Sequence, residues 1–303
     1  MPHDLTNLAA SVRARLLNRA KQDGQTFQSV LNRYAIERLL FRLAVSPHAE
    51  HFVLKGAQLF RLWLATPHRT TKDLDLAGYG VGEGDALAAM MQAICTAEVE
   101  ADGLVFDPAT VRVEPIRVEQ EYHGSRVHLR CRLEQARIDV QIDIGYGDAI
   151  VPAAAVIDFP ALLDFPAPRL RAYPMEATIA EKFHAMVTLG ERNSRTKDFF
   201  DVWTLATQCA FEGERLAQAI AATFGRRGDS ISAEPPLALT AAFADNQDQI
   251  VRWQAFTRRL GTPAPPAWAE VLAVIRDFLG APCAALAAGE QLDRHWPPGG
   301  PWA

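Results

Sequence analysis

The chain has 303 residues, of which 49% are hydrophobic and 22% charged, and its formal net charge is −5. This length can bury a sizeable core in one or two domains. The negative net charge excludes a uniformly basic surface of the kind that binds nucleic acid along its whole extent.

The cysteines and the hydropathy pattern bear on where the protein works. The four cysteines, Cys95, Cys131, Cys209 and Cys283, lie far apart in the sequence. This spacing argues against a zinc site or a disulfide framework and is typical of a reducing cytosol. No secretion signal is recognisable at the start, and no uninterrupted apolar run approaches the ~20 residues that span a bilayer. We therefore expect a cytoplasmic protein with no membrane partner.

Two helices are predicted first, over residues 5–22 and 27–45. The second repeats apolar side chains at helical spacing and ends at Ser46-Pro47. Residues 11–42 hold an excess of cations, namely Arg13, Arg15, Arg19, Lys21, Arg33, Arg38 and Arg42 against Asp23 and Glu37. This excess predicts either a local basic face, which slightly favours RNA as a partner, or an ordinary solvated helix face.

The most informative segment follows these helices. It predicts a short strand over residues 51–55, a small-residue turn at Gly56-Ala57, a helix over 57–65 and a strand that begins at Asp73. That strand reads Asp73-Leu74-Asp75-Leu76. Alternate residues of a strand point to one face, so the two carboxylates lie side by side while the leucines enter the core.

Paired carboxylates repel each other unless a cation binds between them. All-oxygen ligands favour Mg²⁺ or Mn²⁺ over zinc. A glycine turn just upstream would let the backbone approach a phosphate. The segment therefore predicts metal-dependent chemistry on a nucleoside triphosphate, and the alternative is a solvated strand end.

A second acidic strand is predicted over residues 137–144, after a helix over 84–98 and a β-rich region from about 104. The strand alternates strictly between apolar and polar residues. If it lies beside the first acidic strand, Asp143 or Asp139 becomes a third carboxylate, as a two-metal phosphoryl-transfer site requires. Alternatively, Arg126, Arg130 or Arg132 of a nearby strand neutralises these acids, which we expect for Asp139 more than for Asp143. His123-Gly124-Ser125 is predicted to form a turn.

The second half of the chain is predicted to be mainly helical. The proline-rich stretch 151–174 is expected to be a connecting segment, and the tail from Trp296 to Pro301 is expected to be poorly ordered. These features predict two domains, 1–150 and 151–303.

Residues 175–205 form a second region with candidate functional residues. An apolar helical stripe carries Lys182 at its border and ends at Gly190, a plausible C-cap. Ser194 is expected to cap the next helix, near whose start Asp198 and Asp201 share a face. A lysine ammonium suits a triphosphate. The alternatives are a surface ion pair and acids that serve the helix dipole.

Five blocks of sequence together resemble the AbiEii/AbiGii toxin family of nucleotidyltransferase-fold proteins, which includes the MenT-type toxins of type IV toxin–antitoxin systems. The blocks are Phe52-Val53-Leu54-Lys55-Gly56-Ala57, Arg69-Thr70-Thr71-Lys72-Asp73-Leu74-Asp75, Ile142-Asp143-Ile144-Gly145-Tyr146-Gly147-Asp148, Glu181-Lys182 and Arg195-Thr196-Lys197-Asp198-Phe199-Phe200-Asp201. Several motifs in the right order, from about residue 28 to 260, are more specific than any one motif.

The resemblance implies an α+β fold, in which a polymerase-β-like mixed sheet with helices is followed by a helical half that completes the active site. It implies that Asp73 and Asp75 bind the metal, that Lys182 contacts the nucleotide phosphates and that Asp198 completes the site. We favour Asp143 over Asp139 and Asp148 as the third catalytic and metal-binding acid. The expected nucleotide-binding residues are Lys55, Gly56, Ala57, Lys182 and Lys197.

One departure from the family pattern concerns the first motif. Family members commonly have Gly-Gly or Gly-Ser there, whereas this chain has Gly56-Ala57. Backbone donation to a phosphate survives this change, but a mechanism that uses a serine hydroxyl does not.

These observations lead to a functional hypothesis. We expect a Mg²⁺- or Mn²⁺-dependent nucleotidyltransferase that transfers a nucleoside monophosphate from an NTP to an RNA hydroxyl. The resemblance suggests the 3′ end of a tRNA as acceptor, growth arrest as outcome and a cognate antitoxin encoded nearby. One alternative acceptor is a protein side chain. Another alternative, supported by Ala57, is a non-catalytic nucleotide-binding or interaction protein.

Overall fold

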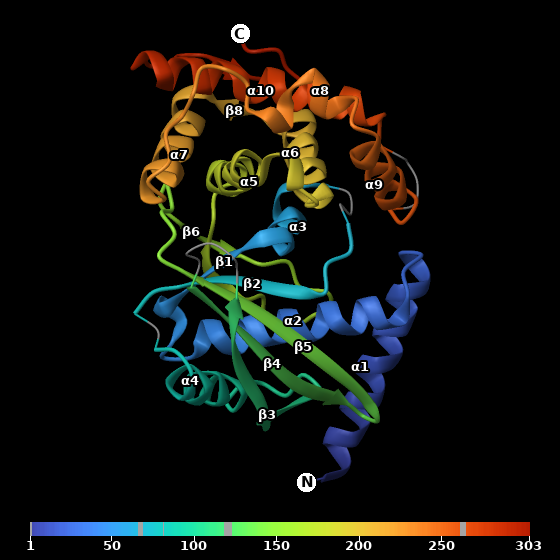
Figure 1. Ribbon diagram of the computed structural model, residues 1–303. Coiled ribbons are helices and arrows are strands. Elements are labelled where there is room, and N and C mark those ends of the chain that lie inside the picture. The colour runs from blue at the N-terminus through green and yellow to red at the C-terminus, as the bar shows by residue number, and fades with distance from the viewer. Residues whose placement is uncertain (1, 66–68, 81, 118–122, 261–264) are drawn as a thin grey trace. The chain divides into compact units, whose positions relative to one another are not determined.

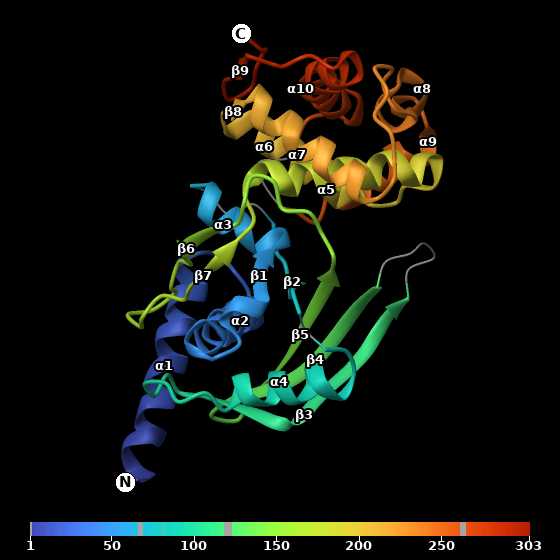
Figure 2. The same cartoon turned by 90° about the vertical axis from the view of Figure 1, so that its left-hand side faces the viewer.

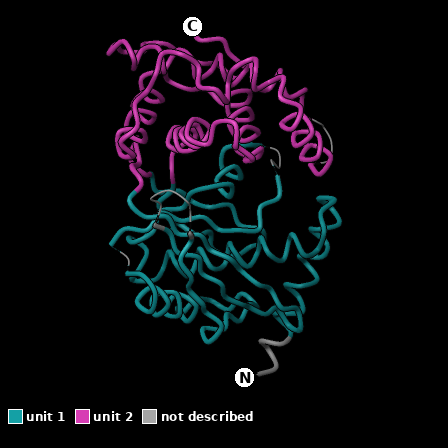
Figure 3. The backbone as a smooth tube through the Cα atoms, in the orientation of Figure 1, with its two compact units in different colours: residues 1–147, 155–172 teal, residues 148–154, 173–303 magenta. Residues whose placement is uncertain are grey.

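The computed structural model describes residues 2–65, 69–80, 82–117, 123–260 and 265–303. The chain divides into two compact units (Figure 3). Unit 1 comprises residues 1–147 and 155–172, and unit 2 comprises residues 148–154 and 173–303. Residues 155–172, which the expected boundary after residue 150 assigns to the second domain, thus belong to unit 1.

Unit 1 combines a sheet with helices (Figure 1). Its elements are α1 (Pro2–Gln22), α2 (Phe27–Val45), β1 (Phe52–Lys55), α3 (Phe60–Trp63), β2 (Asp73–Gly78), α4 (Asp85–Cys95), β3 (Leu104–Arg117), β4 (His123–Leu133), β5 (Ala136–Tyr146), β6 (Ala155–Asp158) and β7 (Arg169–Ala172), with 3₁₀ turns at Ala49–His51 and Gly56–Leu59. The helices predicted near 5–22, 27–45 and 84–98 are confirmed. Residues 57–65 form a 3₁₀ turn followed by one short helix.

The described strands of unit 1 form one seven-stranded mixed sheet with the order β3-β4-β5-β2-β1-β7-β6. β2 pairs parallel to β5 and antiparallel to β1, and β3, β4 and β5 form an antiparallel meander. The predicted mixed sheet with helices is therefore confirmed, and the two acidic strands are direct neighbours.

The two faces of this sheet differ in polarity. In β5 the buried residues Ile138, Val140, Ile142 and Ile144 alternate with polar residues. The helices α1, α2 and α4 pack against the sheet, with α4 along β3 and α2 against β5 (Figure 2). These helices bury the apolar face, since side chains of a strand alternate between faces, and the polar face carries the acidic residues.

Two sequence expectations about strands are wrong. The stretch 151–174 contains β6 and β7, and β7 joins the sheet beside β1 at Leu54 and Ala172. Strands of four residues between prolines leave too little alternation to be recognised. The expected turn at 123–125 lies within β4, where Gly124 pairs with Gly145. A Cβ on Gly124 would lie 3.1 Å from the carbonyl oxygen of Ile144, so glycine here permits a close backbone approach. Val118, which the alternating pattern of β3 includes, lies outside the described residues.

Of the two alternatives for residues 11–42, the local basic face is not favoured, because five of its seven cations pair with carboxylates. Arg38 and Arg42 are buried and bind the Asp102 carboxylate, with nitrogen–oxygen distances of 3.1 and 2.6 Å. On the surface, Arg13, Arg15 and Arg19 pair with Glu134, Asp164 and Asp23 respectively. The helices α1 and α2 therefore present few unpaired cations.

Unit 2 is mainly helical, as predicted. Its elements are α5 (Met175–Leu189), α6 (Thr196–Gln208), β8 (Phe211–Glu212), α7 (Gly213–Arg226), α8 (Ala241–Ala244), α9 (Gln247–Thr257), α10 (Trp268–Ala288) and β9 (His295–Trp296), with 3₁₀ turns at Gly190–Arg192 and Leu237–Leu239. Gly190 ends α5 with φ of +48°, as its C-cap assignment predicts. Ser194 does not cap α6, since Arg195 occupies the N-cap position.

The tail after α10 is ordered, contrary to expectation. The Trp296 indole is 2% exposed and donates a hydrogen bond to the carbonyl oxygen of Ala206 at 2.7 Å. Trp302 stacks on Phe278 with a ring-centroid distance of 5.9 Å and donates to its carbonyl oxygen. Two aromatic anchors thus hold a segment whose proline and glycine content suggested disorder.

One described helix, α10, is long and apolar enough to cross a bilayer by length and composition, with a mean hydropathy of 1.7 in its most apolar window. Its side chains Val271, Ile275, Phe278 and Leu279 are buried within unit 2. The core helix of a soluble protein passes the same test, so the finding is weak evidence for a membrane span.

Candidate active site

The predicted glycine turn and the first acidic strand meet directly. β1 and β2 pair so that Lys55 is opposite Asp75, and Gly56 follows with φ of +76°. A Cβ built on Gly56 would overlap the carboxylate of Asp75. Only glycine fits this position, because any side chain would both strain the backbone and displace Asp75. Gly56 therefore makes room for an acid of the predicted site.

The register between β2 and β5 determines which acid of the second strand lies near the first pair. Asp75 is the Cα partner of Asp143, and Asp73 is the partner of Gln141. Neighbours in register share a face of the sheet. Asp139 lies one further step along β5, beyond Gln141. Asp148 belongs to unit 2, where its carboxylate accepts a hydrogen bond from Tyr173 and pairs with Arg227, both at 3.3 Å.

Arginines of β4 bind both acids of β5. Arg126 donates two hydrogen bonds of 2.8 Å to the two carboxylate oxygens of Asp143. This bidentate contact raises the pKa of the Arg126 guanidinium. Arg130 donates to Asp139 at 2.9 Å. The pairing expected for Asp139 is therefore confirmed, but the expectation that Asp143 is less inclined to pair was wrong.

These residues fit a divalent cation in part. Asp73 is exposed and Asp75 is half-buried, and carboxylate oxygens suit Mg²⁺ or Mn²⁺. The third acid, Asp143, already has both oxygens on Arg126. Within the described ranges there is no group of three or more His, Cys, Asp or Glu arranged to hold a metal. The two acids of β2 therefore fit the cation, and Asp143 would join them only if Arg126 turned away.

In unit 2, a buried cluster surrounds Lys182. The Lys182 ammonium lies 2.6 Å from an oxygen of Asp198 and 2.8 Å from an oxygen of Asp201, and Arg195 lies 2.8 Å from the second oxygen of Asp198. The Asp201 side chain is 0% exposed. Burial alone would lower the pKa of Lys182, but the two carboxylates raise it above its ordinary value. Lys182 is therefore held as a cation.

The structure assigns the predicted site residues to two groups. Lys55, Gly56, Ala57, Asp73, Asp75 and Asp143 belong to unit 1, and Lys182, Lys197 and Asp198 belong to unit 2. Lys197 is exposed on the first turn of α6. Sequence reasoning named Arg126 only as one of three arginines that could neutralise these acids, and it left Asp201 open, because each contacts a partner on another element. The spacing of Asp198 and Asp201, one helical turn apart, was the available signal for the second.

Comparison with known proteins adds family membership. The family model described as nucleotidyl transferase AbiEii toxin, type IV TA system, matches residues 38–274. No curated protein matches the chain.

Two solved structures from Helicobacter pylori resemble the chain. JHP933 has 15% sequence identity and a TM-score of 0.48, with 87% of this chain and 94% of that chain covered. A candidate nucleotidyltransferase has 16% identity and a TM-score of 0.47, with 87% and 96% covered. The family model, which matches residues 38–274, covers most of the chain. The chain therefore belongs to the AbiEii nucleotidyl transferase toxin family of type IV toxin–antitoxin systems.

Proposed function

We propose that the protein is a metal-dependent nucleotidyltransferase that transfers a nucleoside monophosphate from an NTP to a hydroxyl of RNA. The observation that carries this proposal is the strand register that aligns Asp75 with Asp143 on the face that also holds Asp73. Family membership supports the transferase class. It also implies a cognate antitoxin.

The transfer forms one bond and breaks another. The acceptor oxygen bonds to the α-phosphorus of the NTP, the bond from that phosphorus to the bridging oxygen breaks, and pyrophosphate leaves with the electron pair. The acceptor proton passes to a nearby base or to water. When bound, Mg²⁺ would stabilise the negative charge on the reacting phosphates. Asp73 and Asp75 are the residues that would hold it, and Asp143 is our choice for the third acid.

Lys182 is proposed to bind the leaving pyrophosphate. Its ammonium has three donors, of which Asp198 and Asp201 take two. We propose that the remaining donor binds a phosphate oxygen, while the two carboxylates fix the direction of the side chain. Asp198 is then a positioning residue for Lys182. The backbone at Gly56 and Ala57, with Lys55 and Lys197, is proposed to complete the nucleotide contacts.

The test of this proposal is a transfer assay with each of four α-³²P-labelled NTPs, Mg²⁺, total RNA and RNA-free protein extract. Label in the RNA fraction from one NTP, abolished by EDTA, is the expected result. Sequencing of the labelled RNA would then test the 3′ end of tRNA as acceptor. Label in protein alone would replace RNA with a protein acceptor, and NTP binding without transfer would favour the non-catalytic alternative.

A further inference from the structure

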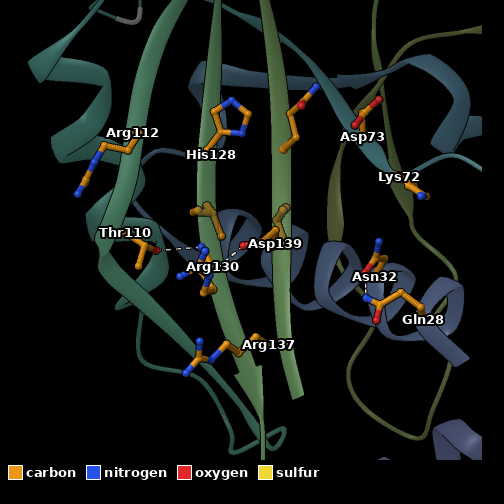
Figure 4. Close-up of a pocket in the computed structure, with 13 residues that line it drawn as sticks. Gln28, Asn32, Lys72, Asp73, Thr110, Arg112, His128, Arg130, Arg137 and Asp139 are labelled. Carbon is orange, nitrogen blue, oxygen red and sulfur yellow. Dashed lines mark hydrogen bonds and ion pairs between the residues drawn. The ribbon is translucent and has the colours of Figure 1, made fainter. Parts of the chain in front are cut away.

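The open face of the sheet in unit 1 is hollowed beside the predicted metal site. A cavity of ≈ 820 Å³ is lined by residues of β3, β4 and β5, by the start of β2 and by the first turns of α2. Figure 4 shows Arg112, His128 and Arg130 projecting from β3 and β4, with Asp73 and Lys72 across the cavity. Because Asp73 belongs to both features, the cavity adjoins the proposed reaction site.

The strand register orders the polar side chains of this face into successive rows. The rows across β2, β5, β4 and β3, from the proposed site outward, are Asp75–Asp143–Arg126–Glu114, Asp73–Gln141–His128–Arg112, Asp139–Arg130–Asp107 and Arg137–Arg132. The first row holds three acids against Arg126, the third holds two acids against Arg130, and the last is purely basic. The charge therefore changes sign along the strands, away from the acids that would hold the cation.

The outer row is unfavourable in the protein alone. Arg132 and Arg137 are Cα partners across β4 and β5, are both exposed, and form no ion pair with any residue in the described ranges. Like charges directly opposite each other destabilise a sheet. An anion bound between the two guanidinium groups would relieve this repulsion.

Two more cations, Arg112 and Lys72, lie between this row and the acids of β2. Arg112 donates to the carbonyl oxygens of Ala109 and Val111, at 2.9 and 2.8 Å, and thereby fixes its guanidinium group. Neither Arg112 nor Lys72 pairs with a carboxylate among the residues that the structure describes. Both line the cavity. Four cations, Lys72, Arg112, Arg132 and Arg137, thus gather on this face, whereas five arginines of α1 and α2 pair with carboxylates.

The spacing favours a chain of phosphates over a single triphosphate. From Arg137 to Asp143, β5 advances six residues, which is about 20 Å at the usual rise of a strand. Cations spread over this length match the backbone of a polyanion. Gln28, Asn32 and Gln141 line the same cavity and supply amide groups that can bind ribose or base edges.

We infer that the face from Arg132 and Arg137 to Arg112 and Lys72 binds the phosphate backbone of the acceptor RNA and leads its terminal hydroxyl toward Asp75. The inference rests on the proposed function for the reaction, but the binding itself can be measured without NTP or metal. It deepens that function, because it assigns the acceptor to a surface of unit 1.

The test compares RNA binding by wild type and by the double variant Arg132→Gln/Arg137→Gln. The probe is a fluorescent RNA single strand of about 12 nucleotides, a length that grooves of this kind cover. Fluorescence anisotropy over a range of salt gives both Kd and its salt dependence. The matched control is Arg169→Gln/Arg294→Gln, because both arginines are exposed and lie outside this face.

We expect the face variant to raise Kd roughly tenfold and to lower the slope of log K against log salt by about 1.4, since each phosphate contact to a single strand contributes about 0.7. The control should match wild type. NTP binding, measured by calorimetry, should be equal in all three proteins. Circular dichroism and thermal melting check that the face variant is folded.

Three results would overturn the inference: equal Kd and salt slope in wild type and the face variant, an equal loss in the control variant, or no RNA binding by wild type. Wild type that labels RNA while the face variant binds RNA normally would end this inference and leave the proposed function intact. If RNA binding needs these arginines but the protein transfers no nucleotide, this inference stands and the proposed function fails.

Discussion

Asp73 of β2 in unit 1 and the two carboxylates around Lys182 in unit 2 have opposite surroundings. Asp198 and Asp201 are buried, with side-chain exposures of 8% and 0%, and the Lys182 ammonium binds both. Asp73, by contrast, is exposed on an open sheet face, and Asp75 is half-buried beside it. The acids around Lys182 have a counter-charge within the protein, whereas Asp73 is exposed to solvent, from which a cation can reach it. We propose that Asp198 and Asp201 position Lys182 and that Asp73 and Asp75 bind the metal.

The largest expected effect is the loss of transfer in Asp75→Ala, a variant that separates a role in catalysis from a role in stability. Asp75→Ala should lower the rate of nucleotide transfer by about 10³-fold or more, because it removes a proposed ligand of the cation. Its free energy of unfolding should change little. Transfer assays and denaturant unfolding measure the two quantities. Asp164→Ala is the control, since that side chain is 98% exposed. Full transfer by a folded Asp75→Ala protein would contradict the mechanism.

Lys182→Met tests the opposite cluster. It removes the ammonium that binds two buried carboxylates, which should lower the free energy of unfolding by about 3–5 kcal/mol and also reduce transfer. Lys197→Met, on the exposed side of the same region, should leave stability unchanged. Adding Asp198→Asn and Asp201→Asn to Lys182→Met should restore part of the lost stability. An unfolding curve of Lys182→Met that matches wild type would remove the distinction between the clusters.

Glu37, a buried acid of unit 1, extends the comparison because only one of its two carboxylate oxygens accepts a hydrogen bond. Glu37 accepts a hydrogen bond from the Leu162 amide, but its second oxygen has no hydrogen-bond partner. Burial raises the pKa of Glu37 from 4.5 to about 7, although the Leu162 amide and the nearby arginines oppose the shift.

The sign of the pH dependence follows from this shift. The folded protein binds the Glu37 proton more tightly than the unfolded chain, so the stabilisation is complete below pH 4.5 and is lost as pH rises through about 7. This loss amounts to about 3 kcal/mol. Glu37→Gln should remove this contribution, as unfolding measured from pH 4.5 to 8 would show. Parallel stability curves for wild type and variant would contradict the assignment.

The smallest expected stability effect concerns the turn that accommodates Asp75. Gly56→Ala should displace that carboxylate and strain a backbone with φ of +76°, lowering stability by about 1–3 kcal/mol and transfer with it. Gly280→Ala is a matched control in α10, where an added Cβ meets no atom within 4 Å. It should be neutral or stabilise by up to about 1 kcal/mol. Normal transfer by Gly56→Ala would show that Asp75 tolerates displacement.

The sequence predicted those elements of the fold and of the site that depend on local periodicity. The alternation at Asp73 and Asp75, the strand over 137–144 and the helix with Lys182 follow from spacing along the chain. The bidentate contact of Arg126 with Asp143 does not, because it depends on which residues of two strands come into register.

Tertiary packing also explains the errors in the second half. Asp201 reaches Lys182 from a different helix, a contact that no sequence spacing encodes. The tail reads as disordered from its prolines and glycines, yet Trp296 and Trp302 anchor it on α6 and α10. Large aromatic side chains can outweigh local composition when the neighbouring surface is apolar.

The most direct test of the central claim is a Mn²⁺ titration followed by electron paramagnetic resonance, with wild type, Asp73→Asn/Asp75→Asn and Asp164→Asn. We expect Mn²⁺ binding by wild type and Asp164→Asn, and its loss in the double variant of β2. Equal Mn²⁺ binding by all three proteins, or none by wild type in the presence of an NTP, would contradict the claim that the acids of β2 hold the catalytic cation.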